Sequence, residues 1–178
     1  MYKYYDNLLE GNQAKDLVKL LLENAGYEVY PYGYESTFSD IKNKLREKGS
    51  GDSKTAHRIR SSPDLLVYDG KTKDVMLVEV KMRRQRNETS VTIYKGEKLR
   101  RIENYREFWN DSILVIVIPF GAVFYAQKIS KLETKESYNV TIDFKAIEDI
   151  FTRIKAKDMR YFRAKAYRIM EKWEKKRK

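Results

Sequence analysis

Three side chains near the middle of the chain, Asp64, Glu79 and Lys81, are of types that can do chemistry together. Two carboxylates provide the hard oxygen ligands that Mg²⁺ prefers, and this ion keeps several waters and completes its shell with substrate phosphate. An ammonium group beside them can orient an attacking water and offset the charge that develops on the phosphate. Taken alone, so short a pattern also fits a strand that starts at Asp64 and a surface Glu79–Lys81 pair.

The elements around these residues are expected to bring them together. Strands are predicted at Asp64–Tyr68 and Val75–Lys81, joined by a polar turn. Symmetric pairing of the two strands places Asp64 opposite Glu79, and directly opposed residues have Cβ atoms about 5 Å apart. Since side chains alternate along a strand, Glu79 and Lys81 share one face, and the core receives Met76, Val78 and Val80.

The remaining elements predict an α/β fold with a mixed sheet and helices on both faces. Helices are expected at 6–25, ending at Gly26, and at 95–109; strands are expected at 27–32, 113–118, 122–128 and 138–144. The segment from 146 to 178 is predicted to be helical, with a break near Lys157. The polar segment 33–62, with a short helix at 37–48, is too long for an idle connection and is interpreted as a functional loop or an insertion.

The charge of the chain favours a polyanionic partner, nucleic acid before acidic membrane. The 37 Lys and Arg residues exceed the 26 Asp and Glu residues, which gives a net charge of +11. Two blocks carry this excess: 153–178 has twelve basic and three acidic residues, and 81–106 has nine basic and three acidic residues. A high content of charged residues is also a habit of thermophilic proteins, but the concentration into two blocks favours nucleic-acid contact.

Several functional classes are excluded by composition. The chain has no cysteine, which removes disulfide scaffolds, thiol catalysis and Cys-ligated zinc. A single histidine, His57, leaves no His-rich metal site, and its basic surroundings suggest a phosphate contact or no role at all. No apolar run is long enough to span a membrane, and the first residues lack the core of a signal peptide, so we expect an intracellular protein without a membrane partner.

The motifs resemble the PD-(D/E)XK nuclease superfamily, in which Ser62-Pro63-Asp64 would be followed, after fourteen residues, by Glu79-Val80-Lys81. The chain up to about Phe151 resembles the Holliday junction resolvase branch of archaea or archaeal viruses, which also fits a thermophilic source. Gly11-Asn12-Gln13-Ala14, at the opening of the first helix, supports this resemblance. It implies a restriction-endonuclease-like mixed central β-sheet flanked by helices over residues 1–152, with 33–62 as a polar loop or insertion. A basic helical C-terminal extension, residues 153–178, would follow.

The resemblance also implies the chemistry of the site. Asp64, Glu79 and Lys81 would be catalytic, and Mg²⁺, or Mn²⁺ in its place, would be bound by Asp64, Glu79 and the backbone carbonyl of Val80. The implied function is that of a metal-dependent endodeoxyribonuclease, which hydrolyses phosphodiester bonds in branched DNA such as Holliday junctions. Two alternatives stay open: a nucleic-acid-binding module that kept the fold without activity, and a restriction-type or RecB-like nuclease with another substrate preference.

The first helix departs from the family pattern. Members often carry a Glu four residues after the helix-opening Gly11, and this chain has Lys15 there. Glu10, roughly 140° away around an ideal helix, is our candidate for the missing metal ligand, and Asp16 is a further acidic neighbour.

Contacts with DNA and with a second subunit are also expected. Arginines that flank the predicted site would bind phosphate, namely Arg58, Arg60, Arg83, Arg84 and Arg86. The family dimerises, and paired nicks across a two-fold junction need two active sites, so a homodimer is predicted. Phe108, Trp109 and Phe120 are the candidates for the centre of its interface, with a position under the C-terminal helix as the alternative.

Overall fold

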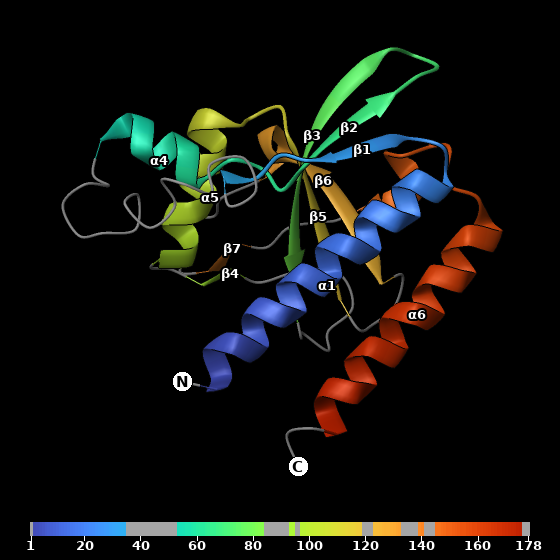
Figure 1. The fold of residues 1–178 in the computed structure, drawn as a ribbon. Coiled ribbons are helices and arrows are strands. Elements are labelled where there is room, and N and C mark those ends of the chain that lie inside the picture. The colour runs from blue at the N-terminus through green and yellow to red at the C-terminus, as the bar shows by residue number, and fades with distance from the viewer. Residues whose placement is uncertain are drawn as a thin grey trace.

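The computed structural model describes residues 2–34, 53–83, 93–94, 97–118, 123–132, 139–140 and 145–175. Its centre is a six-stranded sheet in the order β1-β2-β3-β5-β6-β8 (Figure 1). Strands β3 and β5 are parallel and the other neighbours are antiparallel, so the sheet is mixed. The strands are β1 (Glu28–Pro31), β2 (Leu65–Asp69), β3 (Asp74–Met82), β5 (Ile113–Val117), β6 (Phe124–Lys128) and β8 (Lys145–Ala146). A separate pair joins β4 (Ile93–Tyr94) to β7 (Asn139–Val140).

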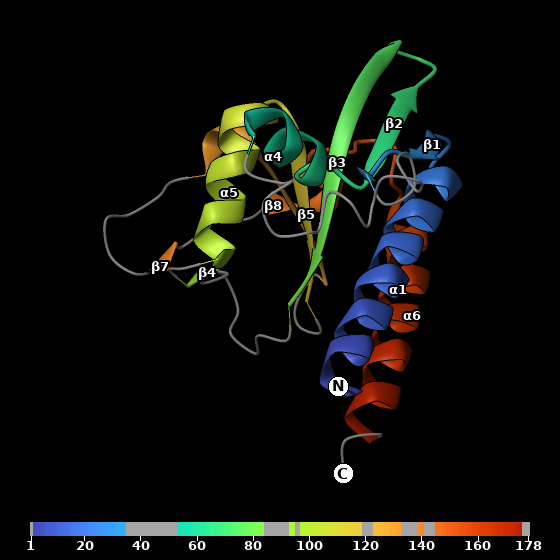
Figure 2. The same ribbon diagram turned by 60° about the vertical axis from the view of Figure 1, so that its left-hand side comes forward.

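Helices cover both faces of this sheet. Figure 2 shows α1 (Tyr2–Asn24) and α6 (Ala156–Lys175) side by side on one face, with α4 (Lys54–Arg60) and α5 (Glu97–Phe108) on the other. The described residues also contain two 3₁₀ turns, Ile129–Lys131 and Ile147–Asp149. The predicted α/β class, a mixed sheet flanked by helices, is confirmed.

The sheet separates two unequal apolar clusters. The larger lies under α1 and α6 and takes alternate residues of β3, including Val78 and Val80. The smaller lies under α5 and gathers Tyr105 with Leu114, Ile116 and a few neighbours. Glu79 and Lys81 therefore project toward the smaller cluster, as the alternation of side chains along β3 predicts.

Helix α6 belongs to the larger core. Its buried residues, Met159, Phe162 and Ala166, pack in the same cluster as Leu17 and Leu21 of α1. Among the described side chains of α6, the exposed basic residues are Lys157, Arg160, Lys165 and Arg168. The C-terminal segment is thus helical, and it combines an apolar face against α1 with a basic outer face.

Some predicted boundaries need correction. Helix α1 starts at Tyr2 instead of Asp6, because residues 2–5 contain no Gly or Pro to stop it. It ends just before Gly26, as predicted, and Gly26 adopts a φ of +86°. The break in the last helical segment lies at 151–155 instead of Lys157, because Phe151 and Ile154 turn into the core before α6 begins.

The polar segment 33–62 contains a helix that the sequence pattern does not predict. Helix α4 starts after Ser53, whose hydroxyl oxygen accepts a hydrogen bond from the amide of Ala56 at 3.1 Å. The helix predicted at 37–48 lies outside the described residues. The strand predicted at 138–144 is described only at 139–140, where it pairs with β4 instead of the main sheet. Among the helices described, none is both long and apolar enough to cross a membrane.

Candidate active site

The β2–β3 hairpin has the predicted register. Leu65 pairs with Val78 and Tyr68 pairs with Val75, so the same register continued by one residue sets Asp64 opposite Glu79. Asp64 lies directly before β2, where this pairing ends. The two carboxylates therefore approach each other at the open end of the hairpin, away from the turn.

Both carboxylate oxygens of Asp64 have a partner. Oδ2 accepts a hydrogen bond from the backbone N–H of Val80 at 2.9 Å, and Oδ1 lies 3.2 Å from the ammonium nitrogen of Lys15 on α1. The backbone carbonyl of Asp64 accepts hydrogen bonds from the N–H groups of Tyr32 and Gly33, at 2.9 and 3.2 Å. These bonds fix the position of Asp64 although it lies outside a strand.

Glu79 is the most deeply buried charged residue that the structure describes, with 1% of its surface exposed. Its Oε1 is paired with the ammonium group of Lys81, while its Oε2 is buried and lacks a hydrogen-bond partner. Burial raises the pKa of the Glu79 carboxyl to about 7. The Asp64 carboxylate also raises this pKa, while Lys81 and, more weakly, the hydroxyl of Tyr105 lower it.

Lys81 connects this carboxylate to α5. Its side chain is 29% exposed, and its ammonium nitrogen lies 5.8 Å from the centre of the Tyr105 ring. Because Tyr105 is itself buried in the smaller apolar cluster, one wall of the site is apolar. Water is thereby kept from one side of the Glu79–Lys81 pair.

The donor atoms fit a hard divalent cation such as Mg²⁺. Asp64 and Glu79 offer carboxylate oxygens, and the unpartnered Oε2 of Glu79 is a buried acceptor that a cation would satisfy. The Val80 carbonyl points to the same edge of β3 as its amide, which is the edge of Asp64. Within the described residues no group of three or more Asp, Glu or His side chains gathers. Glu10 lies in α1, but its side chain is outside what the structure describes.

The candidate phosphate-binding arginines have varied surroundings. Arg58 is exposed, and its guanidinium lies 5.4 Å from the centre of the Trp109 ring. Arg60 lies 3.3 Å from the Nδ1 atom of His57, and Arg83 donates to the carbonyl of Met82 at 2.8 Å. Arg84 and Arg86 lie outside the described residues.

Trp109, predicted for a dimer interface, is engaged within the chain. Its indole N–H donates to the hydroxyl oxygen of Ser61 at 3.2 Å, and its ring meets Tyr32 edge-on, with the ring centres 6.1 Å apart. It packs beside the smaller cluster instead of under α6. Trp109 thus ties α5 to the segment that leads into Asp64.

Sequence reasoning missed the roles of Lys15 and Tyr105 at the site. In the sequence, Lys15 stands out only as a departure from the family pattern, and Tyr105 only as an apolar residue of its helix. One signal exists for Lys15: it stands beside the buried Ala14 at the border of the apolar face of α1. A lysine at such a border can extend its stem over the sheet edge and carry its charge to a partner there.

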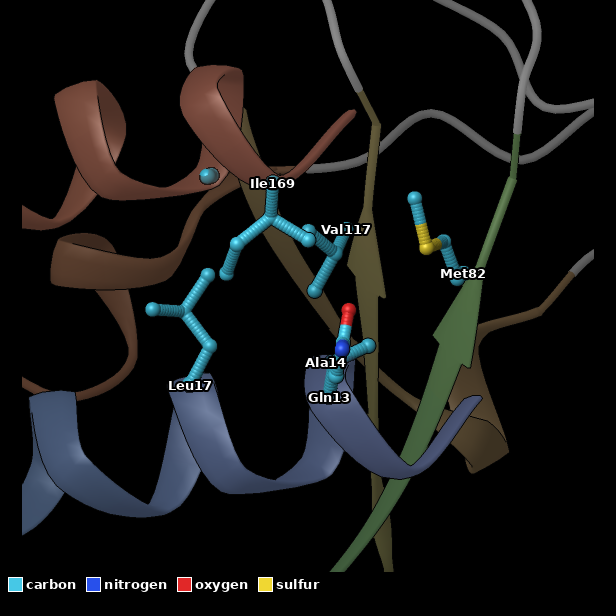
Figure 3. Close-up of a pocket in the computed structure, with 7 residues that line it drawn as sticks. Gln13, Ala14, Leu17, Met82, Val117 and Ile169 are labelled. Carbon is cyan, nitrogen blue, oxygen red and sulfur yellow. The ribbon is translucent and has the colours of Figure 1, made fainter. Parts of the chain in front are cut away.

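A hollow is present in the larger core. Figure 3 shows it between α1, α6 and the ends of β3 and β5, lined mostly by apolar side chains. Gln13 is the polar residue of a lining that otherwise consists of Ala14, Leu17, Met82, Val117, Ala166 and Ile169. This hollow carries no acid, base or nucleophile, so it is a packing feature of the larger core.

Comparisons with known proteins concern the fold. No protein-family model matches the sequence, and no curated protein does so either. Among solved structures, the chain is similar to Hjc, a Holliday junction resolvase from the archaeal hyperthermophile Archaeoglobus fulgidus, with 17% sequence identity. The TM-score is 0.48, over 79% of this chain and 98% of that chain. The chemistry of the site therefore rests on its own residues and their geometry.

Proposed function

We propose that this protein is a Mg²⁺-dependent endonuclease that hydrolyses phosphodiester bonds in DNA. The observation that carries the proposal is the convergence of Asp64, Glu79 and Lys81 at the open end of one hairpin, with a buried carboxylate oxygen of Glu79 left without a partner. Oε2 of Glu148 is also buried without a partner, so what needs a functional reason at Glu79 is such an oxygen beside a second carboxylate and a lysine. A bound cation gives that reason.

The residues would share the work as follows. Asp64 and Glu79, with the Val80 carbonyl, would hold the cation, and Mn²⁺ would serve in its place. When bound, this ion would polarise the phosphate and lower the pKa of a water. The amide of Val80 orients Asp64, and Lys81 would hold the attacking water and offset the negative charge of the transition state. Glu79 must lose its proton first, which its pKa of about 7 allows near neutral pH.

The basic surface would supply DNA affinity. Arg58, Arg60, Arg83, Arg84 and Arg86 flank the site in sequence, and the outer face of α6 adds a second set of cations. Residues 153–178 would thus add a DNA-binding surface to the nuclease domain of 1–152, against whose larger core α6 packs. When one side chain that binds a phosphate loses its positive charge, the logarithm of the DNA-binding constant falls less steeply with the logarithm of the salt concentration, by about 0.9 in slope.

Substitutions that remove positive charges test the role of α6 in DNA binding better than a truncation does, because removing α6 would expose the larger core. We expect Arg160→Gln, Lys165→Gln and Arg168→Gln together to weaken binding to all DNA shapes alike and to flatten the salt dependence. An unchanged salt slope would assign α6 to packing alone.

Branched DNA such as a Holliday junction is the proposed substrate, cut by a homodimer. Two-fold symmetry would present two sites to the two strands that are cut. Light scattering over a hundredfold dilution tests the assembly, and a mass near 21.2 kDa at micromolar protein would contradict paired cutting by a stable dimer.

One observation favours a second candidate function, a nucleic-acid-binding module without activity. Both carboxylates of the site are paired with lysines, Asp64 with Lys15 and Glu79 with Lys81. Such pairing neutralises the negative charge that attracts a cation, and a purely structural site would look the same.

A cleavage assay separates these functions. Purified protein is incubated with four-way junction, flap, single-stranded and linear duplex DNA, each with Mg²⁺, Mn²⁺ or EDTA. Metal-dependent cleavage of the junction supports the proposal, and preference for linear duplex would indicate a restriction-type nuclease. Tight binding of all substrates without cleavage in any metal would indicate the inactive module.

A further inference from the structure

The ammonium group of Lys15 lies beside an oxygen of Asp64 that a bound cation would need. The other oxygen, Oδ2, already accepts a hydrogen bond from the backbone amide of Val80 at 2.9 Å, so Oδ1 has the larger remaining capacity to bind a cation. Lys15 stands 3.2 Å from that atom. A divalent cation and Lys15 would therefore compete for the same position.

The rest of the site does not relieve this competition. Lys81 is paired with Glu79, so the described side chains of the site, two cationic and two anionic, form two ion pairs. A cation entering this group meets no net negative charge, whereas a pair of free carboxylates would attract it strongly.

Helix α1 is held firmly enough to keep Lys15 at this place. The residues that flank Lys15 on the inner face of the helix, Ala14, Leu17 and Val18, are each at most 5% exposed and pack in the larger core. The Lys15 side chain itself is 30% exposed, so a cation or a phosphate from solvent can approach its ammonium group. The core thus fixes the backbone at Lys15, while the ammonium group lies at the edge of solvent.

We propose that Lys15 is a built-in competitor of the metal, a positioning residue that holds Asp64 in the metal-free protein and sets a weak affinity for divalent cations. The inference rests on the metal site of the proposed function. It predicts that removing the charge of Lys15 strengthens cation binding, whereas removing an ordinary structural interaction would weaken it or leave it unchanged.

Lys19 provides a matched control one turn further along α1. It pairs with Glu23 at 3.7 Å, and its side chain is 34% exposed, close to the value for Lys15. Neither Lys19 nor Glu23 contacts Asp64 or Glu79 in any interaction described above. Lys19→Met therefore removes the same charge from the same helix without altering the site.

The experiment measures Mn²⁺ binding by electron paramagnetic resonance, without DNA, at pH 8 and low salt. Lys15→Met should bind Mn²⁺ about tenfold more tightly than the unsubstituted chain, as expected when a partly buried competing charge is removed. Lys15→Arg, which keeps the charge, and Lys19→Met should leave the affinity within about twofold. Asp64→Asn should abolish the gain when it is combined with Lys15→Met.

Each other result has a definite reading. Equal or weaker Mn²⁺ binding by Lys15→Met, in a variant that melts like the unsubstituted chain, overturns the inference; Lys15→Gln serves if the Met variant does not fold. Absence of Mn²⁺ binding in every variant overturns both the inference and the metal dependence of the proposed nuclease. Tighter binding by Lys15→Met without cleavage of any DNA supports the inference and contradicts the nuclease alone.

Discussion

Strand β2 has an aspartate at each end, and the two differ in how they are held. Asp69 closes β2 at the turn and pairs with Asp74, whereas Asp64 precedes β2 at the open end, opposite Glu79. Both are largely buried carboxylates that pair with a cation from a distant segment. The comparison therefore separates a structural ion pair from a candidate catalytic one within a single strand.

Asp69 is held by a backbone amide and by the guanidinium of a packed arginine. Its Oδ1 accepts hydrogen bonds from the Lys71 amide at 2.9 Å and from Arg153 at 2.8 Å. The Arg153 guanidinium in turn lies 4.9 Å from the centre of the Tyr27 ring. The Lys71 amide and, after it, Arg153 hold the pKa of Asp69 below its usual value. All of these interactions favour one charged state in one geometry.

Asp64 has one fixed partner and one exchangeable partner. The Val80 amide fixes Oδ2, while Lys15, whose head can reach water, occupies Oδ1. The adjacent carboxyl, Glu79, has its pKa raised by burial, the opposite of the shift at Asp69. A rigid fork such as Arg suits a permanent clamp, whereas a flexible ammonium suits a position that a ligand must enter. The difference supports the proposal that a cation can replace Lys15 at the open end of the hairpin.

The largest predicted effect concerns the two aspartates themselves. Asp64→Asn should lower the cleavage rate by at least about a hundredfold, because it removes a charged metal ligand, and should leave DNA binding nearly intact, since phosphate contacts come from Lys and Arg. Asp69→Asn should lower the melting temperature but retain cleavage per folded molecule. Cleavage and binding assays on both variants check this. Equal loss of activity in the two variants would contradict a catalytic role for Asp64 and a structural role for Asp69.

The second prediction uses the raised pKa of Glu79. The folded protein holds this proton up to about pH 7, whereas the unfolded chain releases it near 4.5. In EDTA, the free energy of unfolding should therefore fall as the pH rises from 5 to 8, by at most about 3 kcal/mol. In Glu79→Gln this fall should be absent. Urea titrations at several pH values measure it, and an identical pH dependence in both proteins would contradict the assignment.

The smallest predicted effect concerns Gly26, which lies against the Arg153 side chain that pairs with Asp69. Gly26 has a φ of +86°, and a Cβ added there would collide with the guanidinium of Arg153. Gly26→Ala should lower the free energy of unfolding by about 1–2 kcal/mol, through backbone strain and displacement of Arg153. Gly70→Ala is the control, because its added Cβ would meet only Tyr68, at 3.9 Å. Similar melting temperatures of the two variants would show that Arg153 adapts freely.

Much of the sheet could be predicted because its signals are local. The alternation of apolar residues in β3 and the polar run at the turn define the hairpin and its register, and these bring Asp64 near Glu79. Short or capped elements are harder to predict: α4 depends on the Ser53 cap within a polar segment, and the start of α6 depends on where Phe151 and Ile154 enter the core.

The sequence by itself determined which side chains share a face of β3, since the period of a strand is two residues whatever surrounds it. It also determined the basic character of α6. Only the tertiary structure decided the partners of the two aspartates. Lys15 reaches Asp64 and Arg153 reaches Asp69 because α1 and the segment before α6 pack across the sheet at one particular register. No local pattern encodes such a register, since it follows from how the whole apolar core fills its space.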